Sequence, residues 1–137
     1  LELVSGALVT LLMTFDVCGH HLPHLEIHGS AGSLSLPDPN GFGGPVALRR
    51  AGQRQWEDVP LTHGYVDNQR GLGAADMAYA LASGRAHRAD GAMAYHVLDV
   101  MLSLLASAEQ GRTLDVASRC VAPAALPVGL EPGLLDR

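Results

Sequence analysis

The stretch RGLGAADMAYALASGRAHRADGAMAYHVLDVM, residues 70–101, decides the fold class. It holds two helical patterns joined by a short arginine-rich connector. Between residues 74 and 83 apolar side chains recur at helical spacing, and Gly84 is a typical C-terminal stop. Asp90 is a suitable N-cap for a second helix, whose apolar stripe runs to about Gln110. We therefore predict two consecutive helices, the second so apolar that it should be largely buried.

Upstream of these helices the apolar residues alternate with the period of β-strands. The alternation covers residues 7–17, a hairpin over residues 23–36, and two strands over residues 46–50 and 55–59. A last strand is expected at residues 113–120. Strands followed by helices on one side of their sheet define a layered α+β architecture. We expect the α+β class, with an open, mostly antiparallel twisted sheet and two helices packed on one face.

Composition limits the possible partners. The 137 residues suit one domain, and we expect residues 1–122 to form it and residues 123–137 to be its extended tail. Only 17% of the residues are charged, against roughly 25% in ordinary soluble domains, which indicates surface hidden against another domain or subunit. The net charge of −5 argues against nucleic acid. All basic residues are arginine, so no lysine is present for acid–base, Schiff-base or phosphate-loop chemistry.

The sequence also favours a cytoplasmic protein. Cys18 and Cys120 are too few for a disulfide framework, and we expect them to be reduced. Residues 1–15 lack a basic signal-peptide region, and the longest apolar run, residues 7–15, is far shorter than the roughly 20 residues of a membrane helix. We expect no membrane contact. The start at Leu-Glu-Leu, inside a pattern, indicates a chain cut from a longer protein.

At this point a family resemblance becomes visible. The segment HGSAGSLSLPDPN, residues 28–40, resembles the hairpin and proline loop of the glucose–fructose oxidoreductase, inositol dehydrogenase and rhizopine-catabolism (Gfo/Idh/MocA) family. Residues 70–77, 84–88 and 94–101 resemble the helix, connector and long helix that follow in that family, in the same order. The resemblance runs from about residue 8 to residue 127.

The resemblance implies a C-terminal substrate and oligomerisation domain of an NAD(P)-dependent dehydrogenase acting on a sugar, cyclitol or related polyol. Such enzymes bind NAD or NADP in an N-terminal Rossmann domain, and the resemblance begins after the elements that carry their acid–base groups. The chain has no lysine and no Gly-x-Gly-x-x-Gly motif after a strand. We expect no catalytic, cofactor-binding or metal residue here and no cofactor on the chain alone. The implied partners are the Rossmann domain, a small polyhydroxylated substrate, and a second copy on the open sheet face.

The loop before the first helix carries the predicted substrate-binding residues. Loops are where ligand contacts usually lie, and the resemblance places this one near the substrate pocket beside the cofactor domain. The four candidates are His63, Tyr65, Asn68 and Arg70. The alternative interpretation is a surface loop in which Asn68 helps to start the helix and Arg70 pairs with Asp67 or Asp76.

Two further polar groups have a structural and a functional interpretation. We expect Arg85, His87 and Arg88 to bind carbonyl and carboxylate groups around the connector; the alternative is a phosphate site. His96 and Asp99 stand one helical turn apart, where they can hydrogen-bond. Because no nucleophile motif accompanies them, we expect a structural pair rather than a catalytic base.

Other classes of function remain open. Four histidines and Cys18 between residues 18 and 28 supply zinc-ligand types, but His24 and His28 on one strand would lie about 13 Å apart. Trp56 suits packing or stacking on a sugar ring. The alternatives to an enzyme part are therefore a non-catalytic interaction or ligand-sensing module that uses the same sheet face, and a zinc-binding protein built on the histidines.

Overall fold

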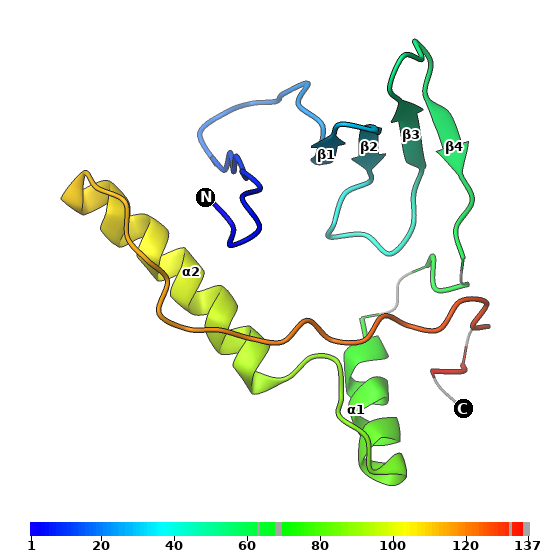
Figure 1. Ribbon diagram of the computed structural model, residues 1–137. Coiled ribbons are helices and arrows are strands. Elements are labelled where there is room, and N and C mark those ends of the chain that lie inside the picture. Colours follow the sequence, from blue (N-terminus) through cyan, green and yellow to red (C-terminus); the bar gives the residue numbers. More distant parts are fainter. Residues whose placement is uncertain (63, 68–69, 132, 136–137) are drawn as a thin grey trace.

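The computed structural model describes residues 1–62, 64–67, 70–131 and 133–135, and shows an open four-stranded sheet followed by two helices (Figure 1). The strands pair antiparallel in chain order: β1 (Leu25–Gly29), β2 (Gly32–Leu36), β3 (Val46–Arg50) and β4 (Glu57–Val59). The helices are α1 (Leu72–Ser83) and α2 (Gly91–Gln110). The predicted α+β class with an open antiparallel sheet is confirmed.

The hairpin predicted over residues 23–36 is also confirmed. Its two strands align their apolar residues, so that Leu25 lies opposite Leu36. At Gly32 a Cβ atom would lie 2.4 Å from the carbonyl oxygen of Arg49. Glycine is therefore required at this point, because β3 passes too close for any side chain.

One face of the sheet is apolar and uncovered. The strand register places seven aliphatic side chains on it, and none is buried. They are Leu25, Ile27, Leu34, Leu36, Val46, Leu48 and Val59. The opposite face is polar, and there the guanidinium carbon of Arg49 lies 5.3 Å from the ring centre of Trp56. The tryptophan therefore makes a cation–π contact.

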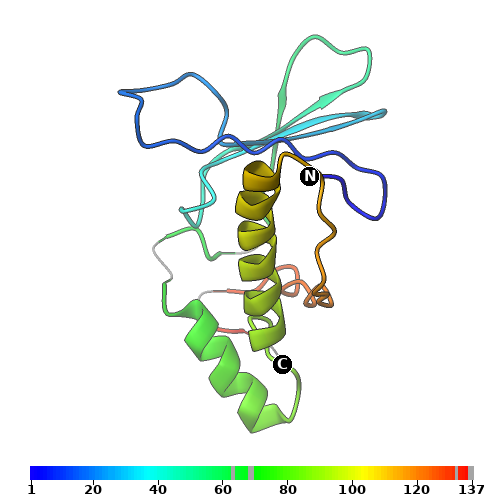
Figure 2. The same ribbon diagram turned by 90° about the vertical axis from the view of Figure 1, so that its left-hand side faces the viewer.

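The strand predicted over residues 7–17 is not formed. The first residues fold back through a single bridge between Glu2 and Leu8, and every side chain up to Leu25 is exposed. A strand needs a neighbour for its backbone hydrogen bonds, and none of the four strands pairs with this segment. Residues 113–120 are likewise extended without a ladder, and run beside α2 in both views (Figures 1 and 2).

The helices do not lie where a layer over one sheet face would place them. Neither helix comes within 8 Å of a strand, measured between Cα atoms. The prediction that the second helix is largely buried was wrong, since no residue of α2 is buried. Apolar periodicity predicts that a helix has an apolar face. It does not predict burial of that face, because burial also requires another segment or chain that covers it.

The accessible surface measures this openness. It amounts to 11002 Å² for a chain of 14.3 kDa, whereas a folded monomer of that mass exposes about 6,800 Å². Among the described residues the buried apolar side chains are Tyr65, Ala80 and Leu135. The small core therefore lies around α1 and the tail, away from the sheet.

The helix ends follow the predicted signals. Gly84 ends α1 with a φ of 72° and Gly111 ends α2 with a φ of 61°, both in the left-handed region that favours glycine. Asp90 begins α2, where its carboxylate accepts a hydrogen bond of 2.8 Å from the backbone N–H of Met93.

Replacing Asp90 by alanine should lower the free energy of unfolding by about 1 kcal/mol, because the first turn loses its hydrogen-bond acceptor. Urea titration followed by far-ultraviolet circular dichroism measures this. Asp90→Asn is the matched control, since it keeps an acceptor oxygen and should retain most of the stability. Equal losses in both variants would contradict the capping role.

Candidate functional site

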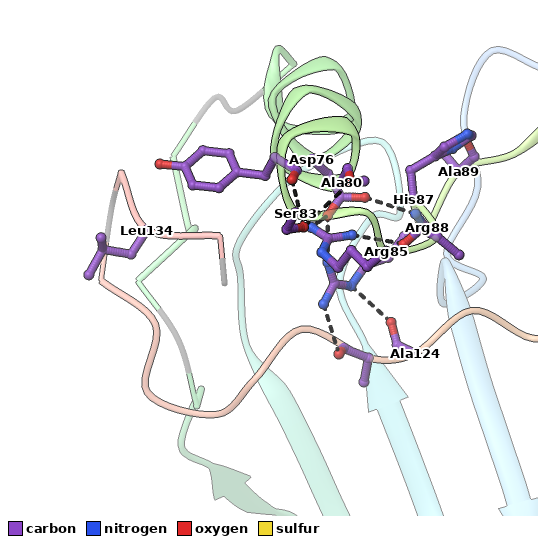
Figure 3. A network of polar contacts seen from close by, with 12 residues as sticks. Asp76, Ala80, Ser83, Arg85, His87, Arg88, Ala89, Ala124 and Leu134 are labelled. Atoms are coloured by element: carbon purple, nitrogen blue, oxygen red, sulfur yellow. Dashed lines mark hydrogen bonds and ion pairs between the residues drawn. The ribbon is translucent and has the colours of Figure 1, made fainter. Parts of the chain in front are cut away.

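The most buried polar side chain of the described residues belongs to Asp76, which is 5% exposed. It lies on α1 one turn before the buried Ala80, so both side chains point to the same side of the helix. Figure 3 shows this side facing the connector between the two helices.

Two arginines of the connector converge on this carboxylate. Arg85 donates from Nη2 to Oδ1 of Asp76 over 2.6 Å, and the Arg88 guanidinium donates to the same oxygen. The backbone N–H of Arg88 donates to Oδ2 over 2.8 Å, and its Nε donates to the carbonyl of Ala124 over 3.0 Å (Figure 3). We call Asp76, Arg85 and Arg88 the clasp. It joins α1, the connector and the tail.

The clasp confirms that the connector arginines bind carboxylate and carbonyl groups; His87 does the same, with Nδ1 2.8 Å from the carbonyl oxygen of Ala89. Burial by itself raises the pKa of Asp76, but the hydrogen bonds from Arg85 and Arg88 outweigh it and lower the pKa to about 2. The ionised carboxylate therefore occupies the position that a bound phosphate would need, and the clasp is a structural element.

A shallow hollow lies beside the clasp, with part of its wall formed by α1. Its volume is about 230 Å³, and its lining comprises Tyr65, Gly71, Leu72, Ala75, Tyr79, Gly133 and Leu135. The Tyr65 hydroxyl donates to the carbonyl of Leu134, which fastens the tail over the hollow. Small-molecule sites usually measure about 300–1,000 Å³, so this hollow is smaller than an ordinary small-molecule site.

The four predicted substrate-binding residues divide into two groups. His63 and Asn68 lie outside the described residues. Tyr65 lines the hollow and is 4% exposed, whereas Arg70 is exposed at the start of α1. Nη2 of Arg70 donates to the side-chain oxygen of Asn40 over 3.3 Å, which ties α1 to the proline loop after β2. Arg70 therefore adjoins the hollow through Gly71 without lining it.

One residue of a second polar group escaped the sequence analysis. Nδ1 of His96 lies 2.8 Å from Oγ of Ser118, and the Ser118 backbone N–H donates to Oδ2 of Asp99 over 2.9 Å. The hydrogen bonds from the Ser118 side chain and backbone lower the pKa of Asp99, and the charge of His96 adds to this. No local motif links residues this far apart in the sequence.

A serine, a histidine and an aspartate together are the components of a nucleophilic triad. In a triad the carboxylate orients the histidine. Here Asp99 instead binds the backbone of Ser118, and His96 binds its hydroxyl. The group therefore fastens the extended residues 112–121 to α2, and we assign it no catalytic role.

The histidine-rich segment forms no metal site among the described residues. The rings of His20 and His24 meet edge to face with centroids 6.2 Å apart, while Nδ1 of His28 lies 3.0 Å from Oγ of Ser33 across the hairpin. Asp16 and His20 stand four residues apart, which would place them one turn apart on a helix, but residues 9–24 form no helix. The spacing alone therefore carries no catalytic assignment.

Neither a scan against protein-family models nor searches of the curated proteins and of the solved structures found a match to this chain. Any function is therefore argued from the residues and their geometry.

The clasp makes stability depend on pH. The folded pKa of Asp76, about 2, lies below the value of about 3.9 for an unfolded aspartate, so its contribution is complete above about pH 5 and is lost as the pH falls through 2. The shift corresponds to about 2–3 kcal/mol. Unfolding free energies of the wild type and Asp76→Asn should therefore differ at pH 7 and converge toward pH 2.

Asp67→Asn is the matched control, because Asp67 is an exposed aspartate just before α1. Its effect should stay within about 0.5 kcal/mol at every pH. A difference between the wild type and Asp76→Asn that persists unchanged at pH 2 would show that the carboxylate charge is not the source of the stability.

Proposed function

We propose that this chain is the substrate-binding and oligomerisation part of an NAD(P)-dependent oxidoreductase that acts on a sugar, cyclitol or related polyol. The cofactor and the acid–base groups belong to a Rossmann domain outside this sequence. The chain works in the cytoplasm, without contact with nucleic acid or membrane. Its own contribution is one wall of the substrate pocket and the surface on which copies associate.

The unclosed surface is the observation that carries this proposal. The accessible area exceeds that of a folded monomer of equal mass by about 4,000 Å². On the apolar sheet face Leu25, Ile27 and Val59 are exposed, and the other four aliphatic side chains are half-buried. A standard protein interface removes about 800 Å² from each partner. The excess is therefore large enough for both a cofactor domain and a second copy, and the low charge content agrees with buried contacts.

The order of elements supports the family assignment. The structure has the same order of elements as the family that the sequence resembles: a hairpin, a proline loop, a helix, an arginine connector and a long helix. The hollow beside α1 is small, as expected for a pocket that a second domain completes. Guanidinium groups donate several hydrogen bonds in one plane, so Arg70 at the rim suits the hydroxyl groups of a polyol.

In this proposal the dinucleotide site lies outside this sequence. Such a site needs a glycine-rich turn between a strand and the N-terminus of a helix. The glycine-rich residues 41–44 instead lie in the loop between β2 and β3. Hydride transfer therefore depends on groups outside this sequence. Tyr65 shapes the wall of the substrate pocket, and Arg70 orients the substrate.

A non-catalytic interaction or ligand-sensing module is the second candidate. The observation that favours it is that both polar groups form hydrogen bonds among their own members. In the clasp Asp76 binds Arg85 and Arg88, and in the second group Ser118 binds His96 and Asp99. Both serve to hold segments together, and neither presents reactive groups to a ligand.

Turnover by the native gene product separates the two candidates. We expect reduction of NAD or NADP with at least one member of a panel of sugars, cyclitols and polyols. Arg70→Ala should raise KM about tenfold with a smaller change in kcat, because one charge-assisted hydrogen bond to the bound substrate is lost.

Arg54→Ala is the matched control, since Arg54 is an exposed arginine in the turn before β4 and should leave both constants unchanged. Absence of turnover with every substrate and both cofactors would reject the enzyme and leave the interaction module.

A further inference from the structure

Helix α2 turns its polar side inward. His96, Asp99 and Ser103 are half-buried on one side, where the extended residues 112–121 lie against the helix. Ser107 continues this side and donates from Oγ to the carbonyl of Arg112 over 2.7 Å. Figure 2 shows the extended segment along one side of α2. The polar contacts of the helix are therefore made within the chain.

The opposite side of α2 is an exposed apolar stripe. At 100° per residue its members fall within one half of the helix circumference. Its apolar members are Ala94, Val97, Leu98, Met101, Leu102, Leu105 and Ala108, and the exposed Glu109 lies on the same side at the C-terminal end of the helix. The large apolar members are 48–64% exposed. Over 18 residues the mean hydropathy reaches 1.4, so by length and composition alone the helix is apolar enough to cross a membrane.

We propose that this stripe is a dimer interface, which α2 of a second copy of this chain covers in antiparallel orientation. An interface with two-fold symmetry needs a surface that is complementary to itself. Five of the seven stripe members, Ala94, Val97, Met101, Leu105 and Ala108, have this property about Met101. Val97 and Leu105 stand four residues before and after it, and Ala94 and Ala108 stand seven residues before and after it.

A two-fold axis through Met101 therefore brings matching groups together. Each Ala94 faces the Ala108 of the other copy, so the helix ends can approach closely, and each Val97 meets a Leu105. The spacing of four and seven residues is that of helices packed side by side, with axes about 8–10 Å apart. In a parallel pair the two Glu109 carboxylates and the two helix dipoles would instead repel.

The available area also fits a second copy. The stripe follows a helix of 20 residues, which is about 30 Å long. Burying about 800 Å² on each copy is enough for a standard interface, and the chain exposes about 4,000 Å² more than a closed monomer.

Asp99 argues against a lipid environment for α2. It lies near the middle of the helix, and its pKa is lowered by the hydrogen bonds from Ser118, so it carries a charge. Insertion would take this charge, and the extended residues 113–120, which form no strand ladder, into hydrocarbon. A protein surface that covers only the apolar stripe leaves the Asp99 carboxylate and the extended segment on the other side of the helix, outside the interface.

Cysteine cross-linking of the full chain tests the antiparallel arrangement. In a chain with Cys18 and Cys120 replaced by serine, Met101→Cys should form a disulfide-linked dimer on mild oxidation, because the axis brings the two copies of this position together. Ala94→Cys alone should stay monomeric on a non-reducing gel, yet link to a second chain that carries Ala108→Cys. Self-linking of Ala94→Cys, or none by Met101→Cys, would overturn the proposal.

Sedimentation equilibrium supplies the second test. Leu98→Glu should weaken self-association at least a hundredfold, with the helix content checked by circular dichroism. Ile27→Lys, on the apolar sheet face, is the matched control and should leave the α2 dimer intact. Association that is lost in Ile27→Lys but kept in Leu98→Glu would assign the interface to the sheet and overturn the α2 proposal.

Flotation with phosphatidylcholine–phosphatidylglycerol vesicles tests whether a lipid bilayer, rather than a second copy, covers the α2 stripe. Wild-type chain that floats with the vesicles while Leu98→Glu does not would assign the stripe to lipid and overturn the proposal; wild-type chain that stays unbound supports it. These outcomes do not depend on turnover by the native gene product, so this inference and the proposed function can fail separately.

Discussion

The carboxylate of Asp76 holds together three segments, α1, the connector and the tail, beside the small apolar core of Tyr65, Ala80 and Leu135. Arg85 and Arg88 bring the connector to it, and Arg88 carries the contact on to the carbonyl of Ala124. Removing charges from water is costly, so the buried carboxylate requires both arginines in place and thereby favours one arrangement of its segments. Here the specified arrangement is the direction in which α2 leaves the connector and the course of the tail beside α1.

From that arrangement the other features follow. With the tail drawn toward α1, Tyr65 and Leu135 become buried and the hollow acquires its second wall. With the residues after α2 brought back along the helix, Ser118 meets His96 and Asp99. Polar contacts thus fix the inner side of each helix, and the apolar surfaces that a closed domain would bury are left on the outside.

Signals that act within a few residues were predictable from the sequence. The hairpin turn, the Asp90 cap and the Gly84 stop depend on local backbone geometry, and all three are confirmed. Strand formation at residues 7–17 and burial of α2 require a neighbour, which apolar periodicity does not supply. The part played by Ser118 could not be found, because its partners lie 19 and 22 residues away in sequence.

The strand order has a consequence for how this chain acquires its structure. Every strand pairs with its immediate neighbour in sequence, so each new strand closes only a short loop and loses little chain entropy. A sheet of this kind can form stepwise as the chain leaves the ribosome, whereas the contact of Arg88 with Ala124 must wait until 36 more residues have been made. Local pairing of the strands therefore comes first in time, and the contact that joins the connector to the tail forms after it.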